Sequence, residues 1–236
     1  MIFRLKRKKK VKNSVMARKL VTVNNSASVI SEQFRTLRTN IRFSLPQQNV
    51  KSLLITSSIP GEGKSTNAAN LGVVFAQEGN QVVIVDADLR KPTLHQTFNT
   101  LNIYGLTDVL TRQQDYFNVI QKTSVEGVFV IPSGPISPNP VELLSSKMMD
   151  ILIQDLKKDY DIIILDAPPI LCVSDAQILS NKCDGTLLVL NMDIVQKADV
   201  LKAKNILTTS KAKILGVVLN NMKIPKNHYY YQTYGL

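Results

Sequence analysis

The sequence contains no tryptophan and only two cysteines and two histidines in 236 residues. Cys172 and Cys183 are too few for a disulfide framework, and they fit no metal-ligand spacing, so we expect free thiols in a reducing compartment. His95 and His228 have no metal-like partners nearby in the sequence and are expected to be structural or solvated. No run of 18 apolar residues exists, and no apolar stretch follows the basic start, so neither a membrane span nor a secretory signal is predicted.

Acidic residues are absent from the first 19 positions, which carry nine lysines and arginines. These positions account for 9 of the net charge of +11 and leave +2 for the remaining 217 residues. We therefore expect residues 1–27 to form a basic, flexible arm. Such an arm could bind an anionic membrane surface, at roughly 1 kcal/mol per basic residue. Non-specific contact with nucleic acid and a purely solubilising role stay open, and no specific nucleic-acid partner is expected.

Residues 52–66 predict a phosphate-binding loop between a buried strand and a helix. The glycines of this loop let the backbone turn tightly, so that successive N–H groups meet phosphate oxygens. Lys64 adds a positive charge that we expect to face the ligand, and the Ser65 hydroxyl is placed to hold Mg²⁺. Ser58 replaces the first glycine of the standard G-x-x-x-x-G-K-[ST] pattern. The predicted nucleotide-binding residues are Pro60, Gly61, Glu62, Gly63, Lys64, Ser65 and Thr66.

Carboxylates follow two further apolar runs, 82–85 and 162–165. Asp86 and Asp88 come directly after the first run, and Asp166 follows the second. Ligands collect at the carboxyl ends of parallel strands, so we expect these carboxylates beside the phosphate loop. Of Asp86 and Asp88, one carboxylate can bind a metal ion while the other binds an incoming hydroxyl group. Asp166 fits the second acidic position of phosphate-loop enzymes.

Strands and helices alternate along the chain, which predicts a doubly wound, mainly parallel α/β sheet with helices on both faces. The predicted body spans residues 28–222 and includes a helix at 28–44 and another at 141–158. In the first helix, Phe34, Leu37 and Ile41 recur at helical spacing, with a basic row one step round. Periodicity alone favours a core-facing stripe with a solvated basic edge.

Four of the seven tyrosines lie within six residues near the end of the chain, at Tyr229, Tyr230, Tyr231 and Tyr234. No apolar period accompanies them, so residues 223–236 are predicted to form a tail. The tail is either a packed edge strand or a solvent-accessible segment whose phenols are modified.

Together these residues resemble the bacterial tyrosine kinases of the capsule and exopolysaccharide type, in their stand-alone cytoplasmic (CpsD/CapB) form. The resemblance covers about residues 28–236. Its motifs are residues 57–66, 85–92 with His95, 138–144, 161–169 with Asp175 and Ala176, the set Glu32, Arg35, Arg38 and Thr39, and the tyrosine-rich end.

The resemblance implies an ATP- and Mg²⁺-dependent kinase whose substrate is its own tail in a neighbouring subunit. Lys64 would neutralise the transferred phosphoryl group, Ser65 would ligate Mg²⁺ directly, and Asp88 and Asp166 would act mainly through its waters. Asp86 would orient the tyrosine and take up its proton. The resemblance further implies that Asn220 meets adenine, that Glu32, Arg35 and Arg38 form subunit contacts, and that the four tail tyrosines are the phosphoacceptors.

The implied partners are other copies of the chain in a ring-like oligomer, an activating membrane adaptor and a cognate tyrosine phosphatase. The implied location is the cytoplasm, with recruitment to the inner membrane face, and the implied role is regulation of polysaccharide synthesis and export. The competing interpretation is a MinD/ParA-type switch ATPase, which shares the sheet, both acidic motifs and the Asn220 position. That group carries a lysine where this chain has Ile59, and it normally lacks a terminal tyrosine cluster.

Overall fold

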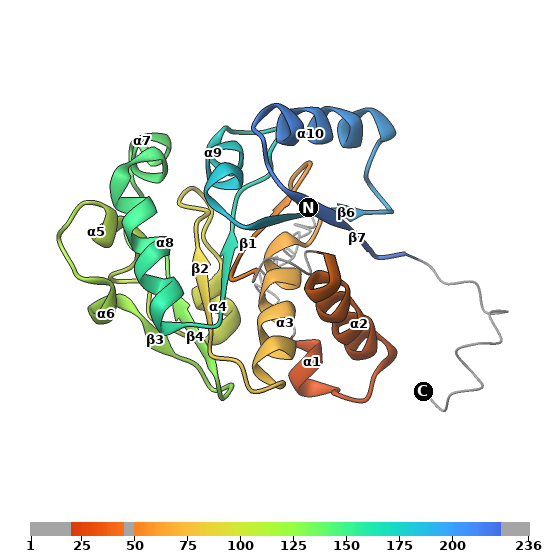
Figure 1. The fold of residues 1–236 in the computed structure, drawn as a ribbon, viewed down its shortest axis with the longest axis horizontal. Helices are drawn as coiled ribbons and strands as arrows, with labels where there is room; N and C mark the ends of the chain where they lie inside the picture. The colour runs from red at the N-terminus through yellow and green to blue at the C-terminus, as the bar shows by residue number, and fades with distance from the viewer. Residues whose placement is uncertain (1–19, 45–49, 223–236) are drawn as a thin grey trace, which may run out of the picture.

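The computed structural model describes residues 20–44 and 50–222. The tail at 223–236 and the first 19 residues of the predicted arm lie outside the described residues. Within these residues, seven strands form one sheet in the order β3-β4-β2-β5-β1-β6-β7 (Figure 1), and only β3 among them runs antiparallel to its neighbour. The strands are β1 (Ser52–Ser57), β2 (Val82–Asp86), β3 (Gln121–Lys122), β4 (Val128–Ile131), β5 (Ile162–Asp166), β6 (Gly185–Asn191) and β7 (Ile214–Asn220).

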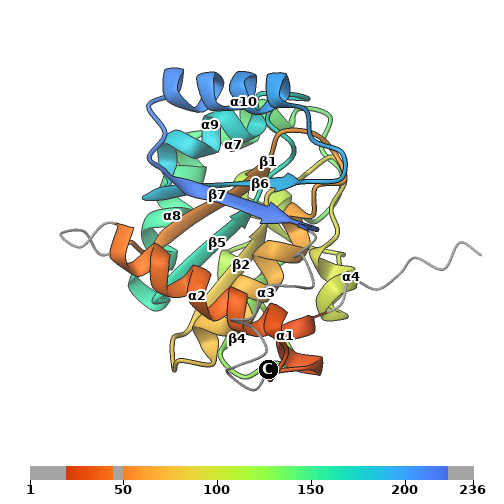
Figure 2. The ribbon, with the colours of Figure 1, turned by 90° about the vertical axis from the view of Figure 1, so that its right-hand side faces the viewer.

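Ten helices cover the two faces of this sheet within the described residues (Figures 1 and 2). One layer holds α1 (Val21–Asn24), α2 (Val29–Ser44), α3 (Lys64–Ala76) and α4 (Leu94–Phe98). The other layer holds α5 (Leu106–Leu110), α6 (Tyr116–Val119), α7 (Pro140–Ser145), α8 (Lys147–Asp159), α9 (Asp175–Lys182) and α10 (Lys197–Thr209). The predicted doubly wound class is confirmed. No helix in the described ranges is long and apolar enough to cross a bilayer.

Alternation along the central strands creates two separate cores. Leu54, Val83 and Ile163 pack on the α5–α10 side, whereas Leu53, Val82 and Ile84 pack on the α1–α4 side. Every residue of β1, β2, β5 and β6 is buried. Strands that are covered on both faces have continuous apolar sequences, so their positions could be predicted from the sequence.

The helix predicted at 141–158 is two helices, because Ser146 adopts an extended conformation (φ −62°, ψ 155°) between α7 and α8. The predicted boundary of the basic arm at residue 27 is also displaced. Thr22 of α1 is fully buried, and its backbone N–H and its hydroxyl both donate to Asn70 Oδ1 of α3, at 3.1 and 2.9 Å. Residues 20–27 therefore belong to the folded body, fastened to the helix that begins in the phosphate loop.

Candidate active site

The loop between β1 and α3 has the backbone shape that its glycines predict. Gly61 and Gly63 have φ values of +86° and +91°, in the region that favours glycine. A methyl group at Gly63 would also collide with the side-chain amide of Asn220. Gly63 is the N-cap of α3 and provides no side-chain cap, so the first N–H groups of the helix lack intrahelical acceptors. The positive end of α3 is thus available to an anion.

Glu62 lies in the predicted nucleotide-binding loop, and its side chain turns into the protein and is fully buried. One carboxylate oxygen, Oε2, accepts hydrogen bonds from the Ser58 hydroxyl at 2.7 Å and from the Ile59 N–H at 2.8 Å. The other, Oε1, accepts from the backbone N–H of Asn191 at 3.2 Å. The backbone of Glu62 is the part left for a ligand, and its contact with the nucleotide stays a prediction. The buried carboxylate also explains why serine stands at position 58, since glycine could not donate this bond.

Lys64 and the predicted carboxylates meet at the carboxyl edge of the sheet. The parallel pairing of β2 with β5 sets Asp86 beside Asp166 in register. Lys64 Nζ lies 2.9 Å from Asp88 Oδ2 and 3.3 Å from Asp166 Oδ1. Burial lowers the pKa of Lys64, but the charges of Asp166 and Asp88 outweigh it and raise the pKa overall. Lys64 therefore also serves as an internal counter-ion, which the sequence did not indicate.

Asp86 is fully buried and holds the start of α4. Its Oδ2 accepts hydrogen bonds from the backbone N–H groups of Thr93 and Leu94, at 2.8 and 2.9 Å. Burial, reinforced by the charge of Asp166, raises the pKa of Asp86 to about 7. Burial likewise raises the pKa of Asp166, against the opposing effect of Lys64. A carboxyl group that titrates near neutral pH is suited to accept a proton.

Two buried oxygens of this cluster have no hydrogen-bond partner within the part of the chain that the structure describes: Asp86 Oδ1 and Asp166 Oδ2. Such orphaned acceptors are costly unless a ligand, water or ion satisfies them. No group of three or more His, Cys, Asp or Glu side chains in residues 20–44 and 50–222 could hold a metal ion. A cation here would need the Ser65 hydroxyl, water or phosphate oxygens to complete its shell, and the oxygen-rich donor set fits Mg²⁺.

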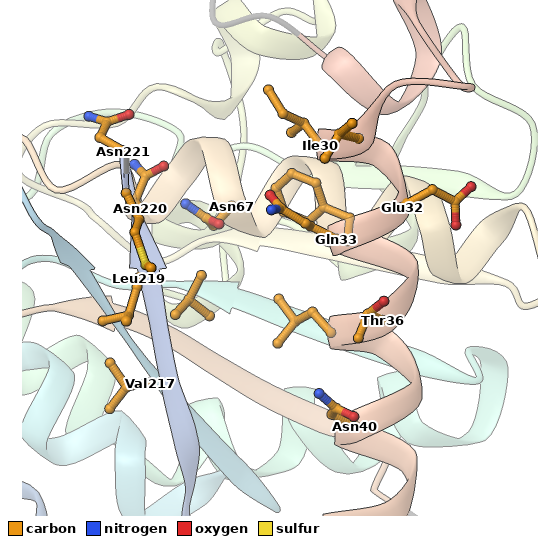
Figure 3. Close-up of a pocket in the computed structure, with 15 residues that line it drawn as sticks. Ile30, Glu32, Gln33, Thr36, Asn40, Asn67, Val217, Leu219, Asn220 and Asn221 are labelled. Atoms are coloured by element: carbon orange, nitrogen blue, oxygen red, sulfur yellow. The ribbon is translucent and has the colours of Figure 1, made fainter. Parts of the chain in front are cut away.

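Asn220 ends β7 at one end of a groove of about 620 Å³ between β7 and α2, with Asn67 of α3 between them (Figure 3). Its side-chain N–H₂ donates to the backbone carbonyl of Glu62 at 2.9 Å. The predicted adenine-contacting residue is thus joined to the phosphate loop.

Comparison with known proteins shows the family of the chain. Residues 50–200 match the family model described as an AAA domain. The chain is 47% identical over 227 residues to the tyrosine-protein kinase YwqD of Bacillus subtilis (strain 168), covering 96% of this chain and 95% of that protein. This chain belongs to the bacterial tyrosine kinases. It is a protein-tyrosine kinase by family, and its relatives include the tyrosine-protein kinase CpsD of Streptococcus agalactiae serotype III (strain NEM316), at 39% identity over 83% of this chain and 84% of that protein.

Solved structures place the kinase in the same group. The chimerical protein CapA2B2 has a TM-score of 0.84 and 43% identity, covering 87% of this chain and 90% of that chain. The kinase domain of the Escherichia coli tyrosine kinase ETK has a TM-score of 0.82 and 30% identity, covering 89% and 84%. MinD of Pyrococcus horikoshii OT3, complexed with Mg-ADP, is more distant, with a TM-score of 0.63 and 27% identity over 75% and 74% of the two chains.

The predicted subunit-contact residues of the kinase make contacts inside the subunit. Arg38 donates to the backbone carbonyl of Val74 at 2.6 Å and pairs with Glu78 at 3.3 Å, and its side chain is only 14% exposed. Arg35 pairs with Glu32 and also donates to the carbonyl of Ser26. Arg38 therefore fastens α2 to α3, whereas Glu32 and Arg35 are more exposed. Their role between subunits stays a prediction.

Two long-range contacts near the site had no local signal in the sequence. Arg90, after the second acidic motif, pairs with the buried Asp175 of α9 at 3.2 Å. The backbone N–H of Asn191, at the end of β6, donates to the Glu62 carboxylate. The partners lie 85 and 129 positions apart, so only the folded chain brings them together.

Proposed function

We propose that the kinase transfers the γ-phosphoryl group of ATP to Tyr229, Tyr230, Tyr231 and Tyr234 in the tail of a neighbouring copy. The observation that carries this proposal is the buried cluster of Lys64, Asp86, Asp88 and Asp166 at the start of α3, in which Asp86 and Asp166 each keep one oxygen without a partner among the described residues. This arrangement occurs in a chain whose tyrosines gather at one end.

The loop backbone and the start of α3 would hold the phosphates, and Lys64 would turn from its carboxylates toward the β- and γ-phosphate oxygens. Mg²⁺ supplies charge neutralisation on those oxygens when it is bound. Ser65 would ligate it directly, with Asp88 and Asp166 holding its waters. Preorganised charge of this kind is the main source of rate in phosphoryl transfer.

Asp86 would orient the tyrosine and accept its proton. The tyrosine oxygen forms the new bond to phosphorus while the bond to ADP breaks, and the phenolic proton moves to Asp86 Oδ1. A phenol has a pKa near 10, so a base helps at neutral pH. The free Oδ1 and a pKa of about 7 support Asp86 in this role.

Asn220 would contact adenine at its end of the groove between α2 and β7. Tyr229 follows Asn220 by nine positions and can reach at most roughly 30 Å from it. That reach includes both the site of the same subunit and that of a neighbour, and the family resemblance favours the neighbour.

The wider setting follows from the resemblance. We propose a ring-like homo-oligomer with Glu32 and Arg35 at subunit contacts, activation by a membrane adaptor that recruits the kinase to the inner membrane face, and reversal by a cognate phosphatase. Residues 1–19 would assist through anionic lipid. The output would be control of capsular or extracellular polysaccharide synthesis and export.

The test is to incubate the full chain with Mg-ATP, with and without the cytoplasmic segment of a candidate adaptor, and to map phosphotyrosine by mass spectrometry. Phosphate on residues 229–234 that disappears in Lys64→Met, and persists in the surface control Lys197→Met, supports the proposal. The second candidate is a MinD-type switch ATPase, favoured by the MinD likeness. ATP hydrolysis without any phosphotyrosine would decide for that candidate.

A further inference from the structure

A carboxylate lies inside the loop that should receive an anion. Glu62 is the residue between the two left-handed glycines, Gly61 and Gly63, and its side chain is fully buried. A negative charge here would repel phosphate if it faced the ligand. Instead it faces three donors, namely one hydroxyl group and two backbone N–H groups. A buried carboxylate is tolerated when donors surround it in this way.

The contacts of Glu62 join three separate parts of the site. Its carboxylate holds Ser58 and Ile59 at the beginning of the loop and Asn191 at the end of β6. Its backbone carbonyl accepts from Asn220 at the end of β7. The loop thus has its shape imposed by contacts that do not involve a ligand.

We infer that Glu62 is a positioning residue for the nucleotide. It holds the loop in its phosphate-binding shape before the nucleotide arrives, and it ties that shape to Asn220, where the base would bind. Ser58 completes this arrangement, because its hydroxyl donates to Glu62 from the position where the standard pattern has glycine. The inference rests on the proposed function in that the ligand is a nucleotide.

The consequence is a lower cost of binding, because a preorganised loop has less conformational freedom to lose. Glu62→Gln keeps the size of the side chain but turns one oxygen into an N–H₂ group. Either the N–H of Asn191 or the N–H of Ile59 then faces a donor and loses its acceptor. Loss of one such bond corresponds to a roughly tenfold weaker nucleotide complex.

The experiment measures the Kd for Mg-ADP by calorimetry in the full chain, and backbone hydrogen exchange of residues 58–66 in the nucleotide-free protein. The variants are Glu62→Gln, Ser58→Ala, Ser58→Gly, the double variant Ser58→Ala/Glu62→Gln, and the exposed control Glu126→Gln. We expect a roughly tenfold higher Kd and faster loop exchange for Glu62→Gln, and wild-type behaviour for the control.

The Ser58 variants make the test specific and disturb folding less. Ser58→Ala should raise the Kd a few-fold in the wild-type background and change it little in the Glu62→Gln background, because both changes break one interaction. Ser58→Gly restores the standard pattern, yet it should bind no better than Ser58→Ala. A merely structural role would lower the melting temperature and leave the Kd of the folded variants unchanged.

Two results overturn the inference, and they can be told apart. If the wild type binds Mg-ADP and both Glu62→Gln and Ser58→Ala bind equally well with unchanged exchange, the positioning role is wrong while the proposed function stands. If the wild type does not bind Mg-ADP, the proposed nucleotide site itself fails, and the positioning role fails with it.

Discussion

The acidic cluster and the charged side of α2, both identified from the sequence, differ in which hydrogen-bonding groups the fold leaves unpaired. In the acidic cluster, Asp86 Oδ1 and Asp166 Oδ2 are buried and have no partner among the described residues. On α2, two nitrogens of the Arg38 guanidinium reach a carbonyl and a carboxylate while its Nε is buried without a partner among the described residues, and Arg35 reaches Glu32. Unpaired carboxylate oxygens grouped beside the phosphate loop favour a ligand site, whereas the α2 charges are largely explained by contacts within the fold.

The two regions also differ in how much their charges cost. The side chains of the cluster at Lys64 are almost completely buried, so each missing partner there costs considerable folding free energy. The pair of Arg35 with Glu32 is partly exposed, and such pairs contribute little to stability. Mutations should therefore separate the regions by the size and kind of their effects.

The largest effect is expected for Lys64→Met. Kinase activity should fall by a factor of about 10³ or more, because a preorganised charge at the phosphoryl group is lost. The nucleotide-free protein should also lose about 3 kcal/mol of stability, since Asp88 and Asp166 lose their cation. Phosphotyrosine assays and thermal melting check the two parts. An unchanged melting temperature would mean that Lys64 faces only the ligand, as the sequence suggested.

Asp86→Asn should lower kinase activity by about 10²–10⁴ and change how stability depends on pH. An unfolded aspartate loses its proton near pH 4, whereas burial raises the pKa of folded Asp86 to about 7. Between these values the folded state binds more protons, so stability from this group falls as pH rises from about 4 to about 7.

The asparagine variant lacks this titration. Its melting temperature, compared with that of the wild type without nucleotide, should therefore rise between pH 5 and pH 8. A difference that stays constant across this range would contradict the buried, raised pKa of Asp86.

The α2 region should show smaller effects that divide between two arginines. Arg38→Ala should cost about 1.5–3 kcal/mol in urea unfolding, because Val74 and Glu78 lose a charged donor. Arg35→Ala should change stability by less than about 0.5 kcal/mol. If Arg35 lies at a subunit contact, its variant should reduce assembly in light scattering while stability is kept. Equal stability losses for both arginines would contradict the expectation that Arg38 stabilises the fold more than Arg35 does.

The sequence was most informative where one local pattern determines one structure. Apolar runs ending in Asp86 and Asp166 located two central strands and set both carboxylates at the same edge. Glycine spacing located the loop and the start of α3. The sequence did not reveal that Ser146 divides the helix predicted at 141–158, because an isolated serine is compatible with either conformation.

The sequence also did not indicate in which direction the side chains of the site point. Glu62 and Arg38 lie in motifs that are easily recognised, yet both side chains turn inward to partners that are distant in sequence. The contact between Arg90 and Asp175 has the same character. Local patterns identify the residues of a site, but only packing decides whether a side chain meets the ligand or supports the residues that do.

The most direct test mixes two variant subunits, one without kinase activity and one without tail tyrosines. One subunit is Lys64→Met with its tail intact, shown by circular dichroism to be folded, and the other is an active subunit with Phe at Tyr229, Tyr230, Tyr231 and Tyr234. With Mg-ATP, and with the adaptor segment where the wild type requires it, phosphotyrosine should appear on the tail of the Lys64→Met subunit. No phosphate on that tail, under conditions where wild-type chains phosphorylate theirs, would contradict transfer between subunits.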